Sequence, residues 1–169
     1  GYNKCKGNVM AQNPKWCQPL SVWKSYFTKW TNDPEPQNIL DSSIFFDFRC
    51  VYGKKKFADE LRNHIDNETE RNGLFFFHMA SSINKFKTET ITENVDIKRI
   101  TFPIVQAIRT LAIKENIYEN NTLERIKTLE NKQNLNIPTK PIADYYEFLF
   151  LLRLKTQVQA IINNEPADN

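Results

Sequence analysis

The chain has 169 residues, of which 40% are hydrophobic, and its formal net charge is +3. This length and apolar content suffice for one core, so we expect one domain, or one domain with an appendage. The charge is too weak for the concentrated basic face of a nucleic-acid-binding protein, and no apolar run approaches the ~20 residues that span a bilayer. We therefore expect a cytoplasmic protein that binds neither nucleic acid nor a membrane.

The cysteines and glycines narrow the class further. Cys5, Cys17 and Cys50 follow no zinc-ligand spacing, and only His64 and His78 could assist them. The sequence predicts no metal site, and free thiols in a reducing compartment. Four glycines are few for a sheet protein with many tight turns, so the composition favours helices joined by polar loops. Because the first residue is glycine rather than methionine, we expect a piece of a longer protein.

The first predicted helix covers residues 20–30, where aromatic side chains recur at spacings of three and four. Residues 33–36 (DPEP) end it, because proline donates no backbone N–H and the residue before a proline avoids helical angles. This tetrapeptide is the predicted domain boundary. Residues 39–52 are ambiguous between an extended segment and a buried helix. We expect a helical start near Gln37 and an extended end before Gly53.

Two further helices are predicted on either side of a break at residues 72–73. Phe57, Leu61 and Ile65 form the apolar stripe of the first, and residues 74–86 form the second. His78 follows three phenylalanines, so we interpret it as a hydrogen-bonded core histidine. Residues 87–98 are rich in Thr and Glu with little helical period, which predicts a loop or a short hairpin.

Three helices are predicted in the C-terminal part of the chain. Thr101 is a hydroxyl cap before Pro103, whose missing N–H costs nothing in a first turn. Asn121 and Glu124 are spaced as a capping box at the start of a short helix that ends near residue 132. Two prolines bracket the start of the longest helix, residues 138–162.

The last helix carries two apolar stripes: Ile142, Tyr145, Leu149 and Leu152, and then Phe148, Leu151, Leu154, Val158 and Ile161. A helix that is apolar over so much of its circumference is typical of the middle of a bundle. We therefore predict an all-α fold, an antiparallel bundle of about five or six helices around this central helix. On this prediction Leu151→Ala would cost ~2–5 kcal/mol.

Three arginines interrupt apolar runs: Arg49, Arg109 and Arg153. A desolvated guanidinium must be paired, because burying it alone costs several kcal/mol. The acidic residues that could pair with them are Asp47, Asp144 and Glu147. Ion pairs that hold the bundle are the favoured interpretation. The alternative is that two of the arginines converge on an open cleft and grip phosphate or carboxylate.

Residues 96–99 (DIKR) form the sharpest polar cluster. In an extended strand, alternation would place Asp96 and Lys98 on one face. Spacing alone favours an exposed ion pair within this segment. The functional alternative is a basic loop whose side chains contact a nucleotide or its acceptor. No Ser-His-Asp order, phosphate-binding loop or dinucleotide fingerprint occurs in the chain.

Five segments follow one another in an order that resembles one bacterial family: residues 7–16 (GNVMAQNPKW), 43–53 (SIFFDFRCVYG), 96–105 (DIKRITFPIV), 121–125 (NTLER) and 146–157 (YEFLFLLRLKTQ). Along its whole length the chain is similar to the putative nucleotidyltransferases often fused to cyclic-nucleotide-binding and CBS domains. Those proteins resemble the uridylyltransferase of the signalling protein PII and the glutamine synthetase adenylyltransferase.

The resemblance implies that residues 1–33 are the end of a nucleotidyltransferase domain and that residues 36–169 are a helical substrate-binding domain. The family's catalytic Gly-Ser and Asp-x-Asp pairs hold metal ions over a nucleoside triphosphate, and this chain contains neither pair. Without such carboxylates we expect no catalytic residue here. Mg²⁺ and a nucleoside triphosphate are expected only in the full-length protein, whose activity the resemblance leaves open.

The resemblance also implies that the helices line the cleft of an upstream catalytic domain in a signalling protein. Arg49, Lys98 and Arg99 would then grip phosphate, and Asp96 would orient them or the acceptor. The expected partners are that domain, a nucleotide and an acceptor protein. The alternative is a structural, regulatory or dimerisation bundle that relays signals from cyclic-nucleotide-binding or CBS domains, and a second copy of the chain is among the expected partners.

Overall fold

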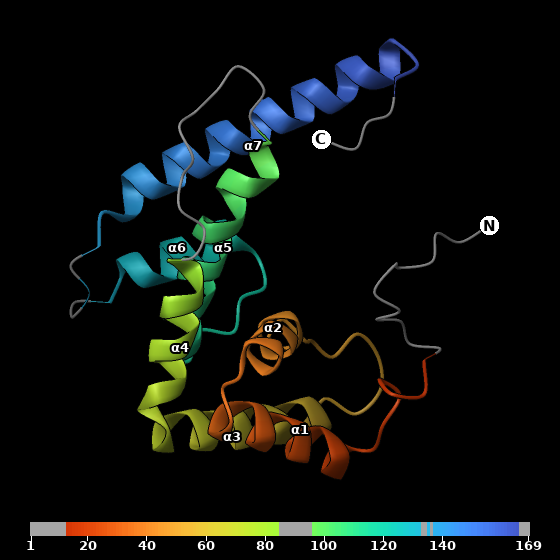
Figure 1. Ribbon diagram of the computed structural model, residues 1–169, viewed down its shortest axis with the longest axis vertical. Helices are drawn as coiled ribbons and strands as arrows, with labels where there is room; N and C mark the ends of the chain where they lie inside the picture. The colour runs from red at the N-terminus through yellow and green to blue at the C-terminus, as the bar shows by residue number, and fades with distance from the viewer. Residues whose placement is uncertain (1–12, 85–95, 133–134, 136, 166–169) are drawn as a thin grey trace. The chain divides into compact units, whose positions relative to one another are not determined.

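The computed structural model describes residues 13–84, 96–132, 135 and 137–165, and every regular element within them is a helix (Figure 1). The predicted all-α class is thus confirmed for this part of the chain. The helices are α1 (Leu20–Asn32), α2 (Pro36–Phe45), α3 (Lys56–Arg71), α4 (Gly73–Ile83), α5 (Ile97–Lys114), α6 (Thr122–Glu130) and α7 (Thr139–Ile162). They fall into two compact units, the first made of the described residues up to 42 with residues 48–75, the second of residues 43–47 with the described residues from 76 onward.

In the first unit α1 packs along α3. Phe27 and Trp30 on α1 and Leu61 and Ile65 on α3 are buried, each pair at the helical spacing of three or four that the sequence shows. The predicted domain boundary at residues 33–36 lies within this unit, between α1 and α2. The expected division of the chain at that point stays a prediction.

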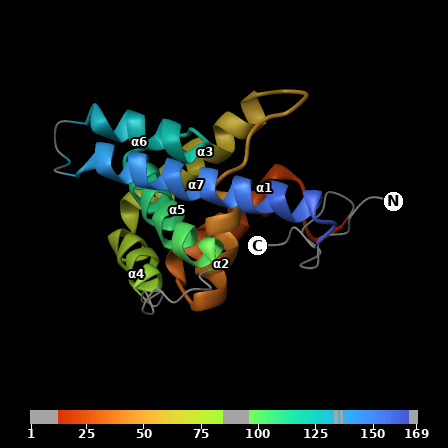
Figure 2. The same cartoon turned by 90° about the horizontal axis from the view of Figure 1, so that it is seen from above.

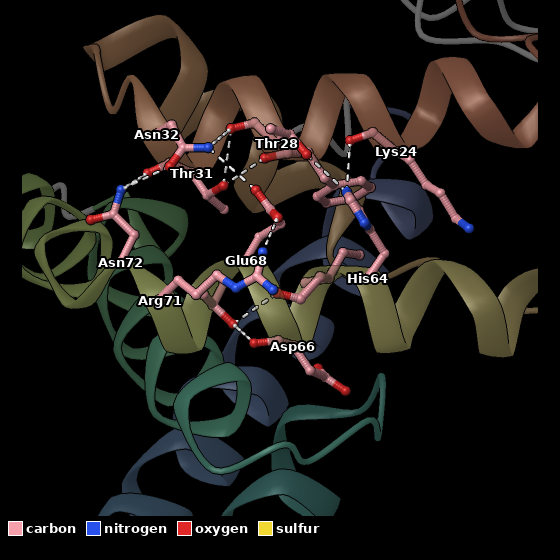
Figure 3. A network of polar contacts seen from close by, with 12 residues as sticks. Lys24, Thr28, Thr31, Asn32, His64, Asp66, Glu68, Arg71 and Asn72 are labelled. Carbon is pink, nitrogen blue, oxygen red and sulfur yellow. Dashed lines mark hydrogen bonds and ion pairs between the residues drawn. The ribbon is translucent and has the colours of Figure 1, made fainter.

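Polar contacts also join α1 to α3 in the first unit (Figure 3). The His64 Nε2 atom lies 2.9 Å from the Thr28 hydroxyl oxygen and 3.1 Å from the Lys24 carbonyl oxygen. The Asn72 side-chain amide, just past the end of α3, donates to the Thr31 carbonyl at 2.7 Å. His64, for which the sequence offers no partner pattern, thus fixes the register of the two helices.

The second unit has its core where α5, α6 and α7 meet. The buried residues of this core are Ile108, Ala112, Ile117, Ile126 and Leu129. Ile142 and Ala143, from the N-terminal half of α7, pack against them. The core therefore takes its apolar side chains from three helices of the C-terminal part of the chain.

The start of α5 lies five residues earlier than the sequence predicts. The Asp96 carboxylate accepts a hydrogen bond from the Lys98 backbone N–H at 2.8 Å and so caps a helix that begins at Ile97. The predicted start at Thr101 is wrong, and Pro103 lies inside the helix. Residues 97–98 are helical rather than part of a hairpin, and the rest of the predicted hairpin, residues 87–95, lies outside the described residues.

α7 is the longest helix, as predicted, but it is not buried along its length. Leu149 is 4% exposed, whereas Leu151 is 62% exposed, so the expected core role of Leu151 is wrong. The C-terminal half of α7 extends past α5 and α6 in two perpendicular views (Figures 1 and 2). The helical period of α7 predicts which of its faces are apolar. It does not predict that one of them stays uncovered by the described residues of this unit.

The structure also tests the predictions for His78, for the end of α4 and for the cysteines. His78 is exposed on α4 and is therefore not a core histidine. Within the described residues α4 ends at Ile83. The predicted end of that helix at residue 86 lies outside the described residues. Cys17 and Cys50 are exposed free thiols, and Cys5 lies outside the described residues. None of the helices in the described part of the chain has the length and apolar character that crossing a membrane requires.

Candidate functional site

An ion-pair cluster of Asp47, Arg109 and Arg125 joins three elements of the second unit. Asp47 lies two residues after the end of α2, and its carboxylate accepts from Arg109 of α5 at 2.5 Å and from Arg125 of α6. The side chains of Asp47, Arg109 and Arg125 are 24%, 15% and 3% exposed, so the cluster is largely shielded from water. One carboxylate therefore ties the end of α2 to both α5 and α6.

Neighbouring amides complete the cluster. The Arg109 guanidinium also donates to the Gln106 side-chain oxygen at 2.8 Å, from one turn earlier on α5. The Gln106 amide in turn donates to the Ser43 hydroxyl at 3.4 Å, and the Asn120 amide donates to the Asp47 carbonyl at 2.6 Å. Both the carboxylate and the backbone of Asp47 are thus held in place.

The position of Arg125 follows from the start of α6. The Asn121 side chain accepts hydrogen bonds from the backbone N–H groups of Leu123 and Glu124 at 2.8 and 3.3 Å, which fixes the first turn as the sequence predicts. From that start Arg125 falls on the same buried face as Ile126 and Leu129. Sequence reasoning missed this arginine, although its place on that apolar face was a usable signal.

The cluster contains two positive charges and one negative charge. The Nε atoms of Arg109 and Arg125 are buried and make no hydrogen bond within the described part of the chain. Each oxygen of the Asp47 carboxylate is engaged by one of the two guanidinium groups. The arrangement can anchor three elements, and its excess positive charge favours a nearby anion.

The other predicted ion-pair residues lie apart from this cluster. Asp144 pairs with Lys140 at 3.3 Å on the exposed side of α7. Arg153, also on α7, makes no ion pair with any described residue, and its Nε atom is buried without a hydrogen bond there. Arg109 thus forms the ion pair that its place in an apolar run predicts. The described residues do not explain the burial of the Arg153 Nε atom.

The predicted substrate-binding residues of the second unit gather at the first turn of α5. Asp96, Lys98 and Arg99 are exposed, and the Asp96 carboxylate is the cap of the helix. The N-terminus of a helix carries a partial positive charge, and two basic side chains stand beside this one. Arg49 is exposed in the loop between α2 and α3 of the first unit, so the structure does not group it with these three residues.

A shallow depression of about 460 Å³ in the second unit is lined by residues 115–119 with Thr128 and Lys132. Glu115 and Lys132 approach to 4.0 Å across it. The residues that the structure describes contain no group of three or more His, Cys, Asp or Glu side chains that could hold a metal ion.

Comparison with known proteins places these features in two family matches. A family described as putative nucleotidyltransferase substrate binding domain matches residues 71–169, and one described as putative nucleotidyltransferase matches residues 1–37. Curated proteins and solved structures gave no match to the chain. The first match covers more than half of the chain and contains all of α5, α6 and α7, including Arg109 and Arg125, whereas Asp47 lies between the two matches.

Proposed function

The chain belongs to the putative nucleotidyltransferase substrate binding domain family, and from this premise we propose that it is a non-catalytic helical module that binds a phosphate-bearing substrate for a nucleotidyltransferase domain. The proposed contact is the start of α5. The substrate would be a nucleotide or a phosphorylated acceptor, and the module would form one wall of the transferase cleft. The protein would act in bacterial signalling.

The observation that carries the proposal is the pair of exposed basic residues on a capped helix N-terminus. Lys98 and Arg99 are the second and third residues of α5, and their backbone N–H groups donate to the side chain and the carbonyl of Asp96. Phosphate oxygens would therefore accept hydrogen bonds from the two basic side chains, beside the partial positive charge of the helix start. Asp96 contributes by holding this turn in helical form, rather than by contacting phosphate, which a carboxylate would repel.

The Asp47 cluster supports the site indirectly. Arg109 lies on α5, the helix that begins at the proposed contact, and the cluster ties that helix to α6 and to the end of α2. A fixed helix axis keeps the two basic residues of its first turn in place, which lowers the entropy lost when an anion binds. Asp47, Arg109 and Arg125 are therefore positioning residues in this proposal.

The transfer chemistry itself is assigned to the partner domain. The described residues offer no metal-ligating group, so we assign Mg²⁺ and the nucleoside triphosphate to that domain and derive no step of the transfer through this chain. The match of residues 1–37 to a putative nucleotidyltransferase supports such a neighbour. Arg49, exposed in the first unit, remains a proposed phosphate contact that must be tested separately.

The proposal is tested by titrating ATP, UTP and inorganic phosphate into the chain and measuring heat or amide chemical shifts. Lys98→Ala with Arg99→Ala should raise the Kd about tenfold or more, because two charge-assisted hydrogen bonds are lost. Lys127→Ala, at an exposed basic position on α6, is the matched control and should leave the Kd unchanged. Absence of binding both here and in the longer protein, or equal binding by all variants, would refute the proposal.

A second candidate function is a regulatory bundle that relays signals from cyclic-nucleotide-binding or CBS domains. The apolar surface that α7 leaves exposed favours it, because such surfaces mark contacts with other chains or domains. The two functions are distinguished in the longer protein with the Lys98→Ala, Arg99→Ala variant. Unchanged transfer with a lost response to the effector would favour regulation.

A further inference from the structure

A stripe of exposed apolar side chains runs along the C-terminal half of α7. Leu151, Leu154, Val158 and Ile161 are 62%, 48%, 46% and 64% exposed, and we call these four residues the α7 stripe. Their spacing of three, four and three residues is the heptad spacing by which helices pair in coiled coils. Similarly exposed side chains flank the stripe on both sides: Phe148, Phe150 and Ile162.

The α7 stripe is separate from the face by which α7 packs in its own unit. Ile142, Ala143 and Leu149 make that packing. With 3.6 residues per turn, the centre of the stripe lies about 160° around the helix from Leu149. Ala143 lies about 40° from that centre but eight residues before Leu151, so the stripe begins beyond the part of α7 that packs in its own unit.

We propose that the α7 stripe is the interface with a second copy of this chain, α7 against α7 about a twofold axis. Self-pairing requires a surface that complements itself, and a straight row of aliphatic side chains at heptad spacing does so. From residue 148 to residue 162 the helix carries no acidic residue, and Lys155 is the one charge on the stripe side; Glu147, four residues before Leu151, lies at the N-terminal end of the same row. Like charges therefore oppose the pairing very little.

The exposed area is of the size that a stable dimer needs. Seven large apolar side chains, the stripe and its flanks, are each about half exposed or more. At about 100 Å² each, pairing two copies would remove roughly 1,400 Å² from water, within the ~1,200–2,000 Å² of stable specific interfaces.

A membrane surface fits the stripe less well. Helices that lie on membranes carry many Lys and Arg residues on a free polar face. From Leu151 to Ile162 α7 carries only two basic residues, Arg153 and Lys155. This proposal does not depend on substrate binding at α5, so either can fail without the other.

Sedimentation of the chain over a concentration series tests the proposal. The mass should rise from the monomer value of 19.9 kDa to twice that value. Leu151→Glu should raise the dimer dissociation constant by about 30-fold or more, as expected for a central interface residue. Leu74→Glu is the matched control, because Leu74 is also a helical leucine, is 67% exposed and lies outside the stripe; it should leave the constant unchanged.

Both variants place the charge at an exposed position, so helical circular dichroism should match that of the unchanged chain. Retained helicity with a monomeric mass for Leu151→Glu alone would support the interface. A chain that stays monomeric to high micromolar concentration would overturn it, even if the stripe then bound another domain or lipid vesicles. A dimer that Leu151→Glu leaves intact would overturn it equally.

Discussion

Replacing Asp47 by asparagine would remove the only negative charge from the Asp47 cluster. Two guanidinium groups, on side chains 15% and 3% exposed, would then lie close together without their carboxylate. The two positive charges would then repel each other with no carboxylate between them. The variant therefore measures how strongly one carboxylate joins residues 43–47, α5 and α6 within the second unit.

The cost can be bounded from the structure. Breaking a buried ion pair by removing one partner costs about 3–5 kcal/mol. Asp47 is 24% exposed, and the asparagine oxygen still accepts one hydrogen bond, so we expect about 2–4 kcal/mol. Such a loss is a large part of the ~5–15 kcal/mol by which a typical domain is stable. The variant should unfold at clearly lower urea concentration.

Urea unfolding followed by circular dichroism at 222 nm gives the change in free energy. Trp16, Trp23 and Trp30 all belong to the first unit, so tryptophan fluorescence reports on that unit separately. Asp144→Asn is the control, since its pair with Lys140 is exposed and should contribute less than ~1 kcal/mol. If Asp47→Asn were no more destabilising than this control, the cluster would not anchor the unit.

Three smaller predictions concern packing and caps. Leu149→Ala should cost ~2–5 kcal/mol, because Leu149 is 4% exposed, whereas Leu74→Ala, at a position 67% exposed, should change stability by less than ~0.5 kcal/mol; equal losses in urea unfolding would contradict the assigned burial. Asn121→Ala should cost ~1 kcal/mol by removing the α6 cap, and faster amide exchange in the first turn of α6 would show it. Asn72→Ala should cost ~0.5–1.5 kcal/mol, seen by tryptophan fluorescence in the first unit, and no loss there would show that its bond to the Thr31 carbonyl is dispensable.

The sequence identifies helices well where local signals agree. α3 has an apolar stripe at helical spacing, and the Asn121 cap marks the start of α6 at the right residue. The start of α5 was misplaced because two caps compete: Thr101 before Pro103, and Asp96 one turn earlier. The structure uses Asp96 because its carboxylate reaches the Lys98 N–H, and Pro103 is tolerated inside the helix.

Burial and pairing depend on contacts that a local pattern does not contain. The period of α7 shows that Leu149 and Leu151 are both on apolar faces, but only the fold shows that one is covered and the other exposed. Likewise Asp47 bonds to Arg109 and Arg125 across 62 and 78 residues of sequence. A charged residue in an apolar run predicts that a partner exists without saying which one.

The Asp47 cluster raises the question of why a buried ionic group is used where apolar side chains would serve. Replacing a buried ion triad by well-packed apolar residues is often neutral or stabilising by about 1–4 kcal/mol, so stability alone does not explain it. Its hydrogen bonds do fix direction, since the guanidinium of α5 meets one carboxylate oxygen and that of α6 meets the other. Asp47→Leu with Arg109→Leu and Arg125→Met should therefore restore stability relative to Asp47→Asn, while binding of phosphate at Lys98 and Arg99 weakens because α5 is less fixed. Unchanged phosphate affinity in a stable triple variant would show that the cluster only holds the fold together.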